Sequence, residues 1–131
     1  MAWVYAVISL ALLQYFLFGM AVGRARGRFG IAAPATTGHP DFERVFRVQM
    51  NTLEQLIMLI PGMWIFATYV NASWAAGLGV VFIIGRALYS AGYTKEAKKR
   101  SWGFGVSALP VMILLVGGLI GAAMSALGGK G

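Results

Sequence analysis

Four apolar stretches, each long enough to cross a lipid bilayer, constrain the fold more than any other feature of this chain. They fall at about residues 2–22, 48–70, 72–93 and 104–127, and a membrane-spanning helix needs about 20 mostly apolar residues. Hydrophobic residues make up 59% of the 131-residue sequence, which is more apolar surface than one small soluble core can bury. The sequence therefore predicts an all-α integral membrane protein, with residues 1–131 forming a single domain of four transmembrane helices.

The first stretch lies at the N-terminus, where a secretory signal peptide would also lie. However, no basic segment precedes its apolar run, the run is longer than that of a signal peptide, and no clear cleavage site follows it. We therefore expect this stretch to be retained as the first transmembrane helix.

Basic residues are distributed unevenly between the predicted connections. The first loop, expected over residues 23–43, and the short third connection carry Arg24, Arg26 and Arg28, and Lys95, Lys98, Lys99 and Arg100, respectively. The connection around Asn71 carries none. By the positive-inside rule, loops one and three are predicted to be cytoplasmic, with both termini on the opposite side. Contact with membrane lipids then accounts for the net charge of +7 without nucleic acid as a partner.

The scarcity of metal-ligating side chains excludes several kinds of site. The chain has no cysteine and a single histidine, so no disulfide, metal site or cysteine nucleophile is expected. The histidine, His39, lies between Gly38 and Pro40 in a turn-forming run. It is predicted to be a solvated loop residue without a functional role, and Asp41 is predicted to cap the second helix.

A polar stripe interrupts the second apolar stretch near its predicted cytoplasmic end. Arg47, Asn51 and Glu54 are separated by four and three residues, which places them within about 60° of one another on a helix. Arg44 joins the same face. Ionised side chains inside a membrane cost roughly 2.5–3.5 kcal/mol each, so those that occur usually face the protein interior and mark a site.

A second polar stripe lies near the cytoplasmic end of the third stretch. Arg86, Tyr89 and Tyr93 are separated by three and four residues and share one helix face. The second helix begins on the cytoplasmic side and the third ends there, so both stripes are predicted to lie at one depth. An interfacial aromatic belt is the alternative explanation for the tyrosines.

Together the two stripes offer guanidinium groups, a carboxylate, an amide and phenols. Arginine binds carboxylates through two parallel hydrogen bonds and glutamate accepts an ammonium group, so the set suits the main-chain charges of a small zwitterionic peptide. The alternative is an internal Arg–Glu network that only fixes helix packing. Glu54 is the only acidic residue in the apolar stretches, so it cannot balance three arginines, and an external anion is expected.

Two sequence strings carry a family resemblance. TTGHPDFERVFRVQMNTLEQ (36–55) and GRALYSAGY (85–93) resemble the membrane-associated proteins in eicosanoid and glutathione metabolism, and the resemblance extends over nearly the whole chain. That family includes glutathione transferases, a leukotriene synthase and a non-catalytic activating protein. The resemblance implies a homotrimer of four-helix subunits, with glutathione bound between adjacent subunits and open to the cytosolic side.

The resemblance also implies roles for single residues. Glutathione would be held by side chains of the first three helices: Arg26, Arg47, Gln49, Asn51, Glu54, Arg86, Tyr89 and Tyr93. Arg26 would reach the peptide from the neighbouring subunit, and Arg100 would activate the thiol. Two positions depart from the leukotriene-synthase branch, because Gln55 replaces a tyrosine ligand and Gly27 replaces a second arginine.

The function implied by this resemblance is a glutathione transferase, with glutathione peroxidase activity as a second expected activity. Glutathione is the co-substrate, no metal is required, and lipophilic electrophiles or lipid hydroperoxides would enter from the bilayer. Two alternatives are left open. One is a non-catalytic lipid-binding scaffold of the same fold. The other is a small four-helix multidrug transporter, a class that usually has a glutamate in its first helix where this chain has only Gln14.

Overall fold

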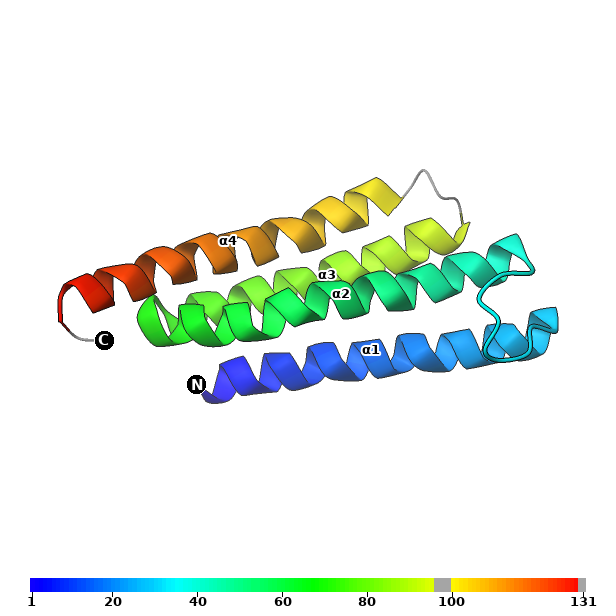
Figure 1. The fold of residues 1–131 in the computed structure, drawn as a ribbon, viewed down its shortest axis with the longest axis horizontal. Coiled ribbons are helices and arrows are strands. Elements are labelled where there is room, and N and C mark those ends of the chain that lie inside the picture. Colours follow the sequence, from blue (N-terminus) through cyan, green and yellow to red (C-terminus); the bar gives the residue numbers. More distant parts are fainter. Residues whose placement is uncertain (96–99, 130–131) are drawn as a thin grey trace.

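Four helices form the described part of the chain. The computed structural model describes residues 1–95 and 100–129, without the side chains of 93–95 and 100–102. The helices are α1 (Ala2–Phe29), α2 (Pro40–Tyr69), α3 (Ala72–Lys95) and α4 (Arg100–Leu127). They run along one long axis, with the N-terminus and the end of α4 at one end of the bundle and the α1–α2 connection at the other (Figure 1). The predicted all-helical fold of four helices is confirmed.

Three of the described helical segments are long and apolar enough to cross a membrane, namely Ala2–Phe29, Ala72–Gly92 and Gly103–Leu127. The fourth predicted span, in α2, is not among them. Polar residues that include Glu54 and Gln55 make α2 the least apolar of the four helices. With 30 residues, α2 is nevertheless about 45 Å long at 1.5 Å per residue.

Two helices extend beyond the apolar stretches, which corrects the expected loop over residues 23–43. α1 continues to Phe29 and α2 already begins at Pro40, so the connection covers only residues 30–39. Hydropathy marks where the membrane ends, whereas arginine-rich sequence is compatible with further helix. Gly30 ends α1 with φ of 69°, a left-handed conformation that glycine adopts without steric cost.

His39 caps the start of α2, which corrects two expectations. Its Nδ1 accepts a hydrogen bond from the backbone N–H of Asp41 at 3.1 Å, so His39 rather than Asp41 caps the helix. Its ring is half-buried and stacks on Phe29, with ring centroids 4.2 Å apart. His39 thus links the end of α1 to the start of α2 and is not a fully solvated loop residue.

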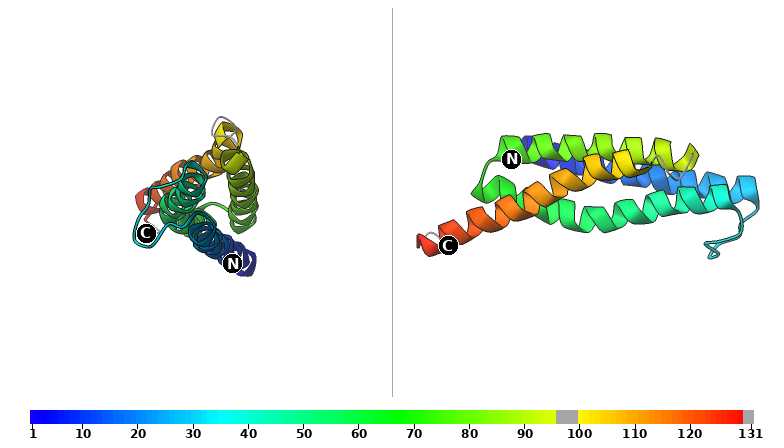
Figure 2. Two further views of the ribbon diagram at one scale, coloured as in Figure 1. Left: turned by 90° about the vertical axis from the view of Figure 1, so that its right-hand side faces the viewer. Right: turned by 90° about the horizontal axis from the view of Figure 1, so that it is seen from above.

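The helices pack so that α1 contacts α2 and α3, while α4 covers α2 and α3. Figure 2 shows α4 beginning beside α3 and crossing toward the end of α2. Glycines permit the close approach of α3 and α4. A Cβ on Gly85 would meet the backbone of Ser107, and a Cβ on Gly103 would meet the backbone of Tyr89. The two backbones are therefore in contact around Arg86.

Candidate functional site

The polar stripe of α2 faces out of the four-helix bundle. Arg47 and Glu54 are exposed, whereas Val48, adjacent to Arg47, is buried. Apolar side chains share this outer face, with Met50 37% exposed and Ile57 68% exposed. In an isolated subunit, this face would bring two charged groups into contact with lipid, which is unfavourable.

Neither Arg47 nor Glu54 forms an ion pair within the part of the chain that the structure describes. Among the described residues, the single ion pair joins Arg44 to Asp41, with an N–O distance of 3.5 Å. Arg44 is therefore neutralised locally, in the first turns of α2. The described residues thus contain no Arg–Glu network of the kind considered as the alternative. Arg47 and Glu54 are accessible to an external group.

Asn51 and Gln49 lie on different sides of α2. Asn51 is half-buried, and its Oδ1 is buried with no hydrogen-bond donor in the described part of the chain. Buried acceptors are normally paired, so this oxygen suits a ligand N–H or a water. Gln49 instead faces α1, because a Cβ added to Gly19 would lie 3.1 Å from its Nε2. It lines a groove of about 410 Å³ together with Leu12, Tyr15, Phe16, Gly19 and Met20.

Arg86, from the second stripe, is enclosed in the bundle with 0% of its surface exposed. Its Nη1 donates a hydrogen bond to Oγ of Ser107 on α4 at 3.3 Å. Its guanidinium carbon lies 4.2 Å from the centroid of the Tyr89 ring, within the range of a cation–π interaction. Nε and Nη2 are buried without an acceptor among the described residues. These contacts direct Arg86 toward α3 and α4 and not toward the α2 stripe.

Tyr89 fixes the relative level of the two stripes. It is 5% exposed and packs with Val48 of α2 and Phe18 of α1. Because α2 and α3 are antiparallel (Figure 1), Asn51 and Arg86, each three residues farther from the α1–α2 connection, lie at about the same depth. The structure thus brings the stripes to one level but does not join them, since one opens outward and the other is enclosed.

Ser107 contributes to the Arg86 environment and was not singled out from the sequence. Its hydroxyl accepts the hydrogen bond from Arg86 and donates one to the Phe104 carbonyl oxygen at 3.1 Å. A signal was available in the glycines, since small residues in membrane helices mark close helix contacts. Gly85 lies directly before Arg86, and Gly103 lies one turn before Ser107.

Arg26 is occupied by the α1–α2 connection of its own subunit. Its Nη1 donates a hydrogen bond to the carbonyl oxygen of Ala35 at 2.7 Å, and its guanidinium carbon lies 5.0 Å from the centroid of the Phe42 ring. Phe42 is buried against Val22 and Ala25. The described contacts of Arg26 are therefore with the loop and the start of α2, and none is with the α2 stripe.

Tyr93 and Arg100 lie near the end of α3 and at the start of α4, at the end of the bundle that holds the α1–α2 connection (Figure 1). Their side chains lie outside the described residues. Their contributions to glutathione binding and thiol activation stay predictions.

The fold and the site define a multi-pass helical membrane protein with its polar groups concentrated toward one end of the bundle. Over residues 3–120, the chain matches the MAPEG family. The chain belongs to this family, as the resemblance of the two sequence strings indicated. Membership removes the multidrug-transporter alternative, while a non-catalytic scaffold within the family stays an alternative.

Similar proteins from other organisms support the same family assignment. The chain is 49% identical to the Synechocystis sp. protein called Uncharacterized protein sll1147 over 118 residues, which cover 90% of this chain and 86% of that protein. It is 42% identical to microsomal glutathione S-transferase 2 of Homo sapiens over 120 residues, covering 92% and 82%. It is 34% identical to leukotriene C4 synthase of Cavia porcellus over 109 residues, covering 83% and 73%.

Proposed function

We propose that this protein is a membrane-embedded glutathione transferase that also reduces lipid hydroperoxides. The observation that carries the proposal is the exposed pair Arg47 and Glu54, for which no ion partner lies among the described residues of its own subunit. The two residues are two helical turns apart, about 10 Å along the axis. They present a cation and an anion to the carboxylate and ammonium groups of one short peptide.

A homotrimer supplies the remaining side of this site. A neighbouring subunit placed over the outer face of α2 would bury Met50 and Ile57 and would remove Arg47 and Glu54 from lipid. Arg26 would then approach the bound glutathione from that neighbour. Such an arrangement resolves the unfavourable combination of charged and apolar side chains on one exposed helix face.

Arg100 is proposed to hold the glutathione sulfur as a thiolate. A free thiol has a pKa of about 8.5, and a fixed cation in a site shielded from water lowers this value and raises the thiolate fraction near neutral pH. The thiolate attacks an electrophilic carbon, forming a C–S bond while the leaving group departs with its electron pair. With a hydroperoxide, the thiolate attacks the outer oxygen, so an S–O bond forms, the O–O bond breaks and glutathione sulfenic acid results. The alkoxide that leaves takes a proton from water and becomes the alcohol. A second glutathione then reduces the sulfenic acid, yielding glutathione disulfide and water.

Turnover by the purified protein in mild detergent tests this function. We expect glutathione-dependent conversion of 1-chloro-2,4-dinitrobenzene and of cumene hydroperoxide by the wild type. The variant Arg44→Gln serves as a control and should keep this activity, because the guanidinium that it removes from α2 is already paired with Asp41. Binding of glutathione without turnover of either substrate would favour the non-catalytic scaffold.

The oligomeric state is tested separately, by native mass spectrometry and by crosslinking in mild detergent. We expect a trimer whose dissociation abolishes glutathione binding. A stable monomer that binds glutathione with full affinity would contradict the intersubunit site.

The proposed orientation places the α1–α2 connection in the cytoplasm and both termini on the opposite side. Because the chain has no cysteine, a Thr36→Cys variant offers a single thiol in that connection. In right-side-out membranes, an impermeant maleimide should label it only after permeabilisation. Labelling of intact membranes would reverse the orientation.

A further inference from the structure

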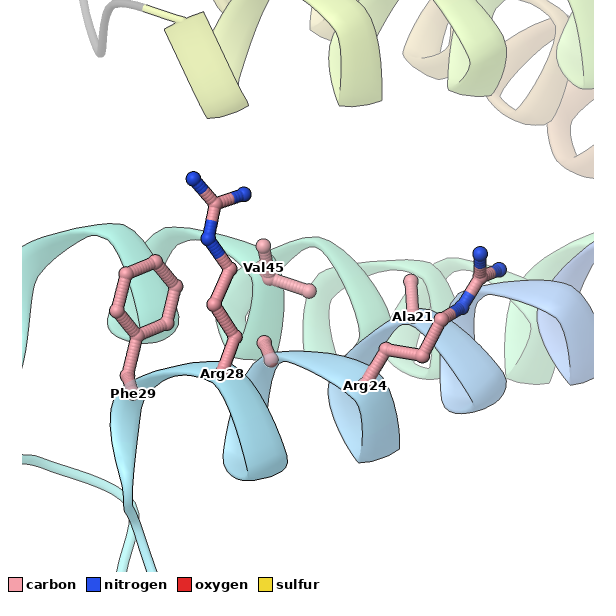
Figure 3. A pocket seen from close by; sticks show the side chains of 6 residues that line it. Ala21, Arg24, Arg28, Phe29 and Val45 are labelled. Carbon is pink, nitrogen blue, oxygen red and sulfur yellow. The ribbon is translucent and has the colours of Figure 1, made fainter.

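A hollow with two arginines lies beside the end of α1, away from the α2 stripe. It measures about 570 Å³ and is lined by Ala21, Arg24, Ala25, Arg28, Phe29 and Val45. Figure 3 shows the side chains of Arg24 and Arg28 extending from the same side of α1, as expected for residues four apart on a helix. The remaining lining residues are apolar, so the hollow combines a cationic edge with an apolar wall.

Neither of these arginines forms an ion pair within residues 1–95 and 100–129, the part of the chain that the structure describes. The acidic residues nearest in sequence are engaged elsewhere, since Asp41 pairs with Arg44 and Glu43 accepts the backbone N–H of Gly38. Arg28 is held over the ring of Phe29, with its guanidinium carbon 5.3 Å from the ring centroid. Two exposed guanidinium groups at one hollow, with no carboxylate among the described lining residues, favour a phosphate as ligand.

The position of the hollow along α1 indicates where such a phosphate would come from. The apolar stretch of α1 ends near residue 22, so Arg24 and Arg28 lie about 3 and 9 Å beyond it at 1.5 Å per residue. The headgroup layers add roughly 5–7 Å to each side of the hydrocarbon core. The two arginines therefore bracket the outer part of this layer, and Ala21, at the inner end of the hollow, lies within the apolar stretch.

We propose that this hollow binds the phosphate of an anionic phospholipid. Arg24 and Arg28 hold the phosphate oxygens, while Ala21, Ala25 and Val45 contact the glycerol end of the acyl chains. The inference is independent of the proposed glutathione site, because neither arginine belongs to it.

Lipid binding measured by native mass spectrometry tests the proposal on the full chain in mild detergent. The wild type should hold phosphatidylglycerol at least about tenfold more tightly than phosphatidylcholine with the same acyl chains. Arg24→Gln and Arg28→Gln should each weaken phosphatidylglycerol binding about fivefold and the double variant about thirtyfold, corresponding to about 1 kcal/mol per arginine near an anionic surface. The doubly substituted R24K/R28K should lie between, since lysine keeps the charge but not the planar fork.

Three controls separate this site from other sources of anion binding. Arg44→Gln removes the same charge outside the hollow and should change the lipid affinity less than about twofold. Glycerol 3-phosphate should compete only weakly, because it lacks the acyl chains that contact the apolar wall. Glutathione affinity of the double variant should equal that of the wild type.

Each control also defines a result that overturns the proposal. An equal loss in Arg44→Gln would show general surface charge, and tight binding of glycerol 3-phosphate would show a site for soluble phosphate. A matching loss of glutathione affinity would assign the hollow to the glutathione site. Unchanged lipid binding in a folded double variant, as judged by thermal melting, would remove the site.

Discussion

Arg47 on α2 and Arg86 on α3 lie within about one helical turn of each other in depth, yet their surroundings are opposite. Arg47 is exposed on an apolar outer face without an ion partner among the described residues. Arg86 is fully buried, bonded to Ser107 and placed over the Tyr89 ring. Both lie on similar polar stripes, and the family resemblance implied that both bind glutathione. Arg47 is therefore accessible to a group from outside the subunit, whereas Arg86 connects α3 to α4.

Removing either charge of the α2 stripe should have the largest effect on binding. We expect Arg47→Ala or Glu54→Ala to weaken glutathione binding by roughly 2–5 kcal/mol, because each change leaves an opposite charge unpaired in the interface that the proposed trimer buries. Isothermal titration calorimetry measures the affinity, with Arg44→Gln as the matched control. Thermal melting of the free protein must show that the variants fold. Two folded variants with wild-type affinity would make the α2 stripe structural, and the contrast with Arg86 would disappear.

Arg86 should matter most for stability of the free subunit. Arg86→Ala empties the space of the largest fully buried side chain, and we expect a loss of about 2–4 kcal/mol in the free energy of unfolding. Arg86→Met should recover most of this loss, because it refills the space without buried N–H groups that lack acceptors. Denaturant unfolding in detergent measures both variants. If Arg86→Ala were as stable as the wild type but unable to bind glutathione, Arg86 would belong with Arg47.

Arg100 provides a third arginine with which to sharpen the comparison. If it acts on the thiol, Arg100→Ala should keep glutathione affinity within a few-fold and move the thiolate titration, read by absorbance, toward about 8.5. A shift of one to two pKa units corresponds to about 1.4–2.7 kcal/mol. Arg100→Lys should restore part of the effect through its charge. An unchanged titration in the folded alanine variant would exclude Arg100 from thiol activation.

Ser107→Ala should have the smallest effect of these alanine substitutions. It removes the hydroxyl that accepts the hydrogen bond from Arg86, so we expect unfolding to become easier by about 1–2 kcal/mol. Glutathione affinity should not change, because Ser107 lies between α3 and α4, away from the α2 stripe. Ser9→Ala removes an exposed hydroxyl that donates to the Tyr5 carbonyl oxygen, and it serves as the control. Loss of affinity in a stable Ser107→Ala variant would connect the enclosed arginine to the ligand.

The fold could be predicted because the thickness of the membrane sets the length of an apolar stretch that spans it as a helix. Each of the four apolar stretches corresponds to one helix. However, α1 ends later and α2 begins earlier than predicted, because both helices continue beyond the apolar residues and hydropathy does not detect these polar turns. His39 shows a related limit. A helix cap depends on one backbone N–H and one side-chain acceptor, and the competing carboxylate of Asp41 is equally plausible from sequence.

The site could be predicted only in part. A helical period shows which side chains share a face, so it placed Arg47 and Glu54 together on α2. It does not show which neighbour that face meets. The inward direction of Arg86 depends on the close approach of α3 and α4 at Gly85 and Gly103, which is a property of two helices and not of either sequence alone.

The hydrogen bond from Arg26 to Ala35 would become a point of thermodynamic linkage in the proposed trimer. If Arg26 releases this carbonyl oxygen in order to bind a glutathione held by the adjacent subunit, ligand binding and the order of the 30–39 connection are coupled. One coupling free energy then links the order of the connection to the affinity for glutathione, and each of the two changes the other by the same factor. Glutathione should speed amide hydrogen exchange in this connection. A molecule that stabilises the contact between the connection and Arg26 should lower the affinity for glutathione by the same factor.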